Sequence, residues 1–182
     1  MVDWEQSNIP RRYVVGVTGH RDLMSGELFV KPLRTAIRNI VTRETGPDGR
    51  LPELVVLSAL AEGADRLVAW EILAIPGSRL EVVLPMGRND YAQDFKTDES
   101  QKEYEQLLDR AVMVNELPAR NIREESYEQA GHYIVDHCDI LLALWNGKPA
   151  AGQGGTGDIV RYAKDKKRPI VRIYPHKQSD RC

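Results

Sequence analysis

The sequence has little cysteine, no long apolar run and no strong excess of charge of either sign. Only two of its 182 residues are cysteines, Cys138 and Cys182, which excludes a disulfide framework like that of small secreted domains. No apolar run approaches the roughly 18 residues that span a bilayer, and residues 1–5 lack the basic and apolar regions of a signal peptide. We therefore expect a soluble, cytoplasmic protein with no membrane partner.

The charge balance argues against nucleic acid as a partner. The formal net charge is −2, so the chain as a whole does not attract DNA, RNA or anionic lipid, although a local basic patch stays open. With 42% hydrophobic and 29% charged residues, the composition is that of an ordinary globular protein. The length suits one domain, which we expect to cover residues 1–182 with its core between about 13 and 174.

Apolar runs typical of buried strands alternate with segments of helical periodicity. Strands are predicted at residues 13–18, 54–57, 80–84, 111–115, 139–145 and 169–174. Helices are predicted from Pro32 to before Gly46, across 67–73, up to Arg110, across 127–138 and from 155 to 167, with a polar connection at 87–96. This alternation predicts an α/β fold, Rossmann-like and doubly wound, with a mainly parallel sheet and helices on both faces.

Three turns marked by glycine lie where a predicted strand meets a helix. They are Gly19-His20-Arg21, residues 58–65 and residues 152–158. In an open α/β sheet, such turns gather outside the carboxyl ends of the strands, where these sheets bind ligands. Glycine lets the backbone approach a ligand closely, and free N–H groups at the start of a helix attract phosphate. The turns therefore predict a site for a nucleotide-like ligand.

The residues of these turns form the predicted site, together with two residues that follow the third strand. Arg21 suits a forked contact with phosphate, Thr156 adds a hydroxyl to the glycine loop, and Glu62 suits the hydroxyls of a ribose. The residues expected to contact the ligand are Gly19, His20, Arg21, Ser58, Ala59, Glu62, Gly63, Asp65, Pro85, Arg88, Gly154, Gly155, Thr156, Gly157 and Asp158.

Other interpretations of the same residues stay open. Arg21 also suits an ion pair with Asp22 or Asp65, and His20 suits capping of a backbone carbonyl. Asp65 lies where a helix-capping residue is expected. The last glycine loop is also typical of a surface connection.

The motifs disfavour two enzyme classes. The last glycine loop does not match the G-x-x-x-x-G-K-[ST] pattern, and it comes late in the chain rather than after the first strand, which disfavours a nucleoside triphosphatase or a dinucleotide dehydrogenase.

Cys138 has His132, Asp136 and His137 near it, but their spacing matches no tetrahedral metal site, and Cys138 continues an apolar helix stripe. We expect core packing for Cys138, and neither a metal nor a cofactor.

Four segments together resemble the SLOG superfamily of Rossmann-like domains, which includes DNA-processing protein A and the LONELY GUY phosphoribohydrolases. The segments are residues 17–21, 58–65, 139–145 and 154–158, and the match spans residues 13–174. The resemblance implies a bound nucleotide or nucleotide-derived signal, such as the cyclic or ADP-ribose-type signals of bacterial defence systems. It also implies a homo-oligomer.

The resemblance also offers an enzymatic alternative, in which the chain cleaves the N-glycosidic bond of a nucleoside monophosphate. The phosphoribohydrolases carry a glutamate three residues after the threonine of their glycine loop, where this sequence has Ile159. Asp158 precedes that position by one residue, so its carboxylate would point about 100° away. The same difference weakens a nucleoside deoxyribosyltransferase. A binding module is therefore preferred, and the catalytic candidates of the alternative are Glu62 and Asp158. The DNA-processing relatives also suggest single-stranded DNA binding, against which the mildly acidic net charge counts.

Trp70 supplies a sequence clue to the expected oligomer. It lies at the border of the apolar stripe formed by Leu67, Val68 and Ile72. A large aromatic at such a border suits an interface between subunits, and it equally suits burial beneath a neighbouring helix.

Overall fold

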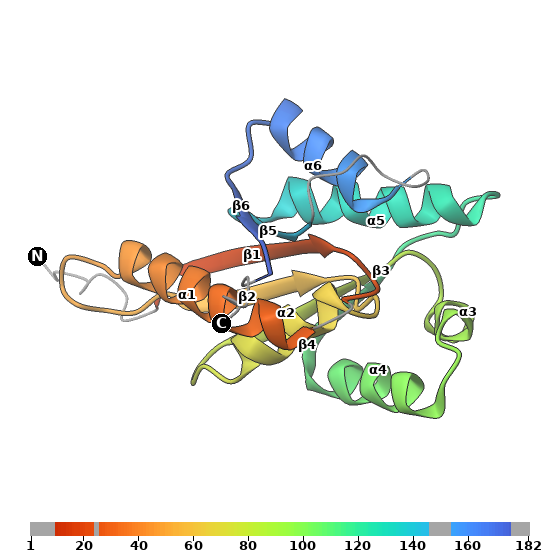
Figure 1. The fold of residues 1–182 in the computed structure, drawn as a ribbon, viewed down its shortest axis with the longest axis horizontal. Coiled ribbons are helices and arrows are strands. Elements are labelled where there is room, and N and C mark those ends of the chain that lie inside the picture. The colour runs from red at the N-terminus through yellow and green to blue at the C-terminus, as the bar shows by residue number, and fades with distance from the viewer. Residues whose placement is uncertain (1–9, 24–25, 146–153, 176–182) are drawn as a thin grey trace, which may run out of the picture.

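Six parallel strands form one sheet in the order β4-β3-β2-β1-β5-β6 (Figure 1). The structure is a computed structural model that describes residues 10–23, 26–145 and 154–175. The strands are β1 (Arg12–Gly19), β2 (Glu53–Ser58), β3 (Arg79–Leu84), β4 (Ala111–Glu116), β5 (Ile140–Leu144) and β6 (Ile170–Ile173). Each of the five pairings is parallel, so the predicted fold class is confirmed.

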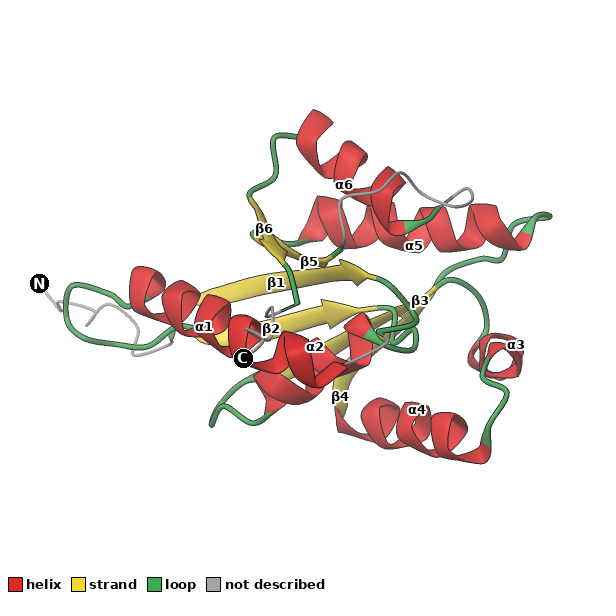
Figure 2. Ribbon diagram, viewed as in Figure 1, coloured by secondary structure: helices red, strands yellow, loops and turns green. Residues whose placement is uncertain are grey.

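Helices cover both faces of the sheet (Figure 2). They are α1 (Gly26–Glu44), α2 (Ala64–Leu73), α3 (Arg88–Tyr91), the 3-10 turn η1 (Ala92–Asp94), α4 (Asp98–Arg110), α5 (Arg123–His137) and α6 (Thr156–Asp165). The core of one face joins Leu33 of α1, Val68 of α2 and Leu107 of α4 to the sheet. The other core contains Ile134 of α5 and Ile159 of α6. The sheet is therefore doubly wound, as its buried apolar strands predict.

The predicted elements differ from the structure mainly in α1 and after β3. Helix α1 begins at Gly26, so Pro32 lies inside the helix rather than in its first turn. The proline removes only one backbone donor, and burial of Phe29 and Leu33 beneath the helix offsets that loss. The polar connection contains α3 and η1, because Tyr91 and Phe95 are buried and pack edge to face with ring centroids 5.2 Å apart.

Cys138 lies at the end of α5 and is 3% exposed, which confirms its predicted place in the core. A Cβ atom at Gly16 of β1 would lie 2.8 Å from the Cys138 sulfur, so α5 packs directly on the backbone of the strand. Burial raises the pKa of the Cys138 thiol to about 11, and the group therefore stays protonated near neutral pH.

Trp70 contacts α4 within the same chain. Its indole Nε1 donates to Glu103 Oε1 at 2.9 Å, and the Arg110 guanidinium lies 5.0 Å from the ring centroid. Trp70 is half-buried, so packing against a neighbouring helix accounts for part of its border position. The homo-oligomer that the resemblance implies stays a prediction.

No helix in the described parts of the chain combines the length and the apolar character that crossing a bilayer requires.

Candidate functional site at the carboxyl edge of the sheet

The chain order of the strands reverses between β1 and β5. From β1 the chain builds β2, β3 and β4 on one side, whereas β5 and β6 are added on the other side (Figure 1). The His20 N–H donates to the Leu144 carbonyl at 3.1 Å, which joins the carboxyl ends of the two strands. In open α/β sheets a crevice forms at such a reversal, because the two connections leave toward opposite faces. This point is the candidate site.

Glycines allow the backbones of the turns after β1 and β2 to pack closely against each other. Gly63 has φ of 77°, and a Cβ atom there would lie 2.5 Å from the His20 carbonyl oxygen. A Cβ atom at Gly19 would lie 2.8 Å from the Leu144 carbonyl oxygen. The Ala64 N–H also donates to the His20 carbonyl at 3.1 Å. Both glycines therefore have a packing role, and their contact with a ligand stays a prediction.

Ser58 and Asp65 form a buried pair beneath the second turn. The Ser58 hydroxyl donates to Asp65 Oδ2 at 3.0 Å, and the Ala59 N–H donates to the same oxygen at 3.1 Å. Ser58 is fully buried and Asp65 is 6% exposed, so neither side chain faces a ligand in this conformation. Burial raises the pKa of Asp65 to about 6, although hydrogen bonds from Ser58 and from the backbone and the charge of Arg21 oppose the shift. These hydrogen bonds hold the turn after β2 in its conformation.

Two further predicted residues, Glu62 and Arg88, hydrogen-bond to side chains of the same chain. Glu62 accepts a hydrogen bond from the Ser100 hydroxyl of α4. Arg88 donates from Nε to Glu116 Oε1 at 2.7 Å, and this hydrogen bond lowers the pKa of Glu116. Pro85 is buried. The structure thus brings Glu62 and Arg88 to α4 and β4 respectively.

Arg21 belongs to a polar cluster with three residues that the list of predicted contacts lacks. Asp94 of η1 accepts from Arg123 Nη2 at 2.8 Å and from the Tyr127 hydroxyl at 2.6 Å. Arg123 also donates to Asp90 at 2.9 Å. Arg21 lies 3.9 Å from Asp94 and 5.0 Å from the Tyr127 ring centroid. We call Arg21, Asp94, Arg123 and Tyr127 the rim cluster.

The rim cluster leaves Arg21 accessible. Its side chain is 44% exposed, whereas that of Asp94 is 12% exposed, so the arginine retains donors that a phosphate can meet. Burial, followed by the hydrogen bond to Asp94, raises the pKa of Tyr127, which therefore remains a donor. The partner of Arg21 is Asp94 rather than Asp22 or Asp65. The sequence signal for the cluster was weak: Arg123 and Tyr127 are one helical turn apart, but nothing marks Asp94.

The amino end of α6 lies beside α5. A Cβ atom at Gly154 would lie 2.9 Å from the Glu128 nitrogen of α5, and Gly154 has φ of 74°, so only glycine suits this turn. Gly155 is the N-cap of α6 and has no side chain with which to cap the first turn, which continues through Thr156 and Gly157. The Asp158 carboxylate accepts from Arg161 at 2.6 Å. The first part of the glycine loop, Gly152 and Gln153, lies outside the described residues.

Two cavities of the described structure lie along α1, not at the carboxyl edge. One of about 450 Å³ separates α1 from β6, and one of about 510 Å³ separates α1 from α2. None of the predicted contact residues lines either cavity. The strand reversal therefore defines the candidate site, and residues 146–153, which follow β5 in the sequence, lie outside the described residues.

No protein-family model and no curated protein matches the sequence. Among solved structures, the chain is similar to DNA processing protein A from Helicobacter pylori, with 16% sequence identity and a TM-score of 0.54. The alignment covers 92% of this chain and 67% of that protein. This likeness supports the Rossmann-like α/β fold.

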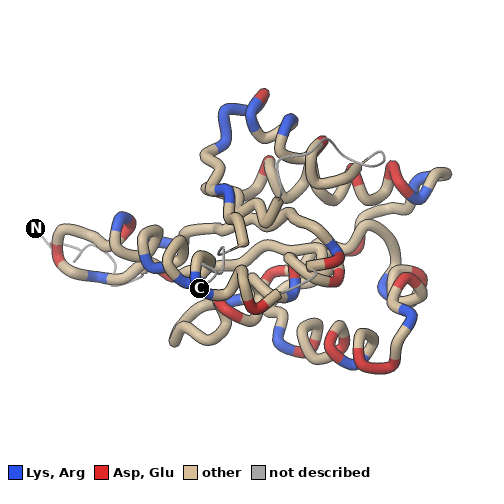
Figure 3. Tube along the Cα trace, in the orientation of Figure 1, with Lys and Arg blue, Asp and Glu red and all other residues tan. Residues whose placement is uncertain are grey.

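The comparison corrects the prediction that argued against nucleic acid as a partner. The related structure is described by its single-stranded DNA binding mode, so this fold is compatible with nucleic acid. The prediction was wrong because it rested on the net charge of −2. A net charge averages over the whole surface, whereas binding depends on the charges that face the ligand, and Figure 3 shows basic and acidic residues interspersed along the chain.

Proposed function

We propose that this chain binds a phosphate-bearing ligand of the nucleotide class between the carboxyl ends of β1 and β5. In this proposal the chain is a SLOG-like binding module that holds a nucleotide-derived signal. Gly155, Thr156 and Gly157 offer backbone N–H groups to a phosphate at the amino end of α6. Arg21 contacts the same ligand from the opposite side of the crevice.

The observation that carries the proposal is the reversal of strand order between β1 and β5. The turn after β1 carries Arg21, and the connection after β5 leads to the amino end of α6. A guanidinium group and the positive end of a helix dipole thus both belong to the connections that flank the reversal. An anion held there interacts with both.

Single-stranded DNA is a second candidate ligand, favoured by the likeness to DNA processing protein A. A nucleotide-derived signal and single-stranded DNA share the phosphate that the crevice suits. They differ in length, because a DNA strand requires several phosphate contacts along a surface whereas a mononucleotide requires one. The two candidates therefore differ in how strongly salt weakens binding.

The test measures binding of ADP-ribose by calorimetry and of a labelled oligodeoxythymidylate by fluorescence anisotropy. Arg21→Gln and Gly155→Val are each expected to reduce the affinity for whichever probe binds by about tenfold or more. Arg21→Gln loses a charge-assisted hydrogen bond, and Gly155→Val prevents the close approach of the backbone to the phosphate. Gly155 has φ of −72° and ψ of 167°, a backbone conformation that valine adopts without strain, and circular dichroism checks that the variant is folded.

The matched control is Gly87→Val. Gly87 is also the N-cap of a helix that follows a strand, but it follows β3, two strands away from the reversal. A Cβ atom there meets only Glu116 Oε2, at 3.7 Å, so the variant should fold and bind like the wild type. Failure of both probes to bind folded wild type would overturn the proposal. Release of free base from AMP, lost in Asp158→Asn or Glu62→Gln, would establish the enzymatic alternative instead.

A further inference from the structure

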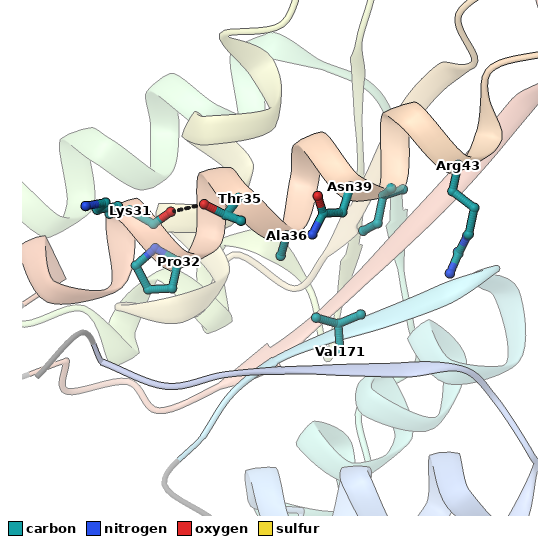
Figure 4. A pocket seen from close by; sticks show the side chains of 8 residues that line it. Lys31, Pro32, Thr35, Ala36, Asn39, Arg43 and Val171 are labelled. Atoms are coloured by element: carbon teal, nitrogen blue, oxygen red, sulfur yellow. Dashed lines mark hydrogen bonds between the residues drawn. The ribbon is translucent and has the colours of Figure 1, made fainter.

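A groove opens between α1 and the edge strand β6 (Figure 4). Its volume is about 450 Å³. Figure 4 shows side chains from one flank of α1 with Val171 of β6 opposite them. The lining residues are Lys31, Pro32, Thr35, Ala36, Asn39, Ile40, Arg43 and Val171. None of them belongs to the candidate site at the carboxyl edge.

Strand β6 lines the groove through Val171 and has a second backbone edge beside it, with which no strand of the described residues pairs. Among the strands that the structure describes, β6 pairs only with β5. The Leu141 N–H donates to the Pro169 carbonyl at 2.9 Å, which directs the backbone groups of Pro169 toward β5. Because backbone groups alternate in direction along a strand, those of Ile170 and Arg172 point away from β5. An added strand would find its hydrogen-bonding partners there.

The lining of the groove favours an extended segment with apolar and acidic side chains. Ala36, Ile40 and Val171 supply apolar surface, and Val171 is only half-buried by α1. No Asp or Glu is among the lining residues. Lys31 is exposed and makes no ion pair with any residue in the described parts of the chain. A carboxylate entering the groove would therefore meet an ammonium group without displacing an existing partner.

We propose that β6 and the groove beside α1 bind an extended acidic segment of a partner protein as a seventh strand of the sheet. Its backbone pairs with Ile170 and Arg172, and its side chains on the α1 side enter the groove. An aliphatic side chain packs on Val171 and Ala36, and a carboxylate pairs with Lys31. Main-chain hydrogen bonds supply affinity in this mode of recognition, and alternate side-chain pockets supply specificity.

The groove suits a protein strand better than nucleic acid. Arg43, the other cation of the lining, already donates to Glu44 at 2.9 Å and to the Tyr13 hydroxyl at 2.9 Å. Nucleic acids bind through several phosphate contacts, whereas this lining offers Lys31 as a cation without an acidic partner among the described residues. A phosphate uses only the N–H donors of a backbone edge, whereas a protein strand pairs with both the N–H and the C=O groups of Ile170 and Arg172. This inference is independent of the proposed nucleotide site.

The test is an NMR titration of the ¹⁵N-labelled protein with a peptide that alternates glutamate and valine. We expect shifts concentrated at residues 170–174 and on the flank of α1 that lines the groove. Lys31→Glu is expected to reduce the affinity for the peptide by about tenfold, because an attractive charge pair becomes a repulsive one. The control is Arg38→Glu, which changes the same charge on the same helix. Arg38 is exposed and does not line the groove, and its contact with the lining is a hydrogen bond to the Thr35 hydroxyl at 3.4 Å.

A second pair of variants tests the backbone edge. Arg172→Pro removes the outward N–H group, and proline is tolerated on edge strands. Arg172→Ala keeps that N–H group, while it loses the same contact of the guanidinium with Trp145, 5.1 Å from the ring centroid. Binding is expected to disappear in Arg172→Pro and to persist in Arg172→Ala.

Three results would overturn the inference. The peptide could produce no shifts, or shifts only at the carboxyl edge of the sheet. Lys31→Glu and Arg38→Glu could reduce the affinity for the peptide equally, which would indicate a diffuse electrostatic attraction rather than a specific ion pair. Oligodeoxythymidylate could produce the same shifts more strongly than the peptide, which would make the groove a nucleic-acid surface.

Discussion

Asp65 illustrates how a residue chosen for ligand chemistry serves the fold instead. Its carboxylate accepts hydrogen bonds from Ser58 and Ala59, and the side chain is almost fully buried. The predicted capping role is not observed, because the N-cap of α2 is Gly63 with no side-chain cap, and Asp65 accepts from the turn before the helix. A buried carboxylate also makes the stability of the protein depend on pH, which offers a direct test of the arrangement.

Acidification should stabilise the wild type relative to Asp65→Asn. Burial raises the pKa of Asp65 to about 6 from an ordinary value of 3.8, so between these values the folded protein retains a proton that the unfolded chain has released. The stabilising effect is complete below the unfolded pKa and is lost as pH rises through the folded pKa. The free-energy difference between the two proteins should change by about 1 kcal/mol in favour of the wild type from about pH 7 to about pH 5.

Urea unfolding at the two pH values measures this difference. Asp109→Asn controls for the loss of one negative charge, because Asp109 is exposed and makes no ion pair with any residue in the described parts of the chain. A wild type that instead loses stability relative to Asp65→Asn on acidification would show that the carboxylate is held in its charged form.

The turns after β1 and β2 act as one packed unit, because the second turn approaches the first through glycine. Gly63 combines φ of 77° with ψ of −113°, a conformation open to few residues other than glycine. The carbonyl groups of His20 and Arg21 occupy the space that a side chain would need. The geometry of the candidate site thus depends on a contact between two connections, not on either turn alone.

Gly63→Ala should destabilise the protein by at least about 3 kcal/mol, because overlap with backbone adds to the strain of a positive φ. Gly77→Ala is the matched control. Gly77 has φ of 80°, but nothing lies within 4 Å of its Cβ position, so its substitution should cost only about 1 kcal/mol. Equal losses of the two variants in urea unfolding would show that the second turn does not pack tightly on the first.

In the whole molecule, the sheet is built around strands that are distant in the sequence. Val15 of β1 pairs with Val56 of β2 and with Ile140 of β5, so the last third of the chain completes the centre of the sheet. The edge strand β4 is less protected: Val112 is 56% exposed and Met113 is 46% exposed. A register irregularity also separates Leu80 from Glu81 in its pairing with β3.

Amide hydrogen exchange should therefore be slowest in β1, β2 and β5 and at least about tenfold faster in β4, because edges open without disrupting the buried cores. Exchange measured by NMR tests this order in the folded protein. If β4 exchanged as slowly as β1, its edge would be covered in solution, contrary to the exposure of Val112 and Met113.

The sequence by itself determined the class of the fold and the positions of its strands. Runs such as residues 54–57 and 140–144 are apolar without alternation, and only a strand covered on both faces buries every residue of such a run. Helical periodicity between these runs then requires parallel strands with crossovers. The glycines of the turns also marked, from the sequence alone, where the connections approach one another.

Only the tertiary structure decided which polar groups meet. Arg21 pairs with Asp94, more than seventy positions away in the sequence, rather than with the neighbouring Asp22. Ser58 turns inward to Asp65 instead of facing a ligand. The physical reason is that burial of apolar strands depends on local pattern, whereas ion pairs and hydrogen bonds depend on distances of a few ångströms between separate connections. Those distances exist only once the sheet has assembled.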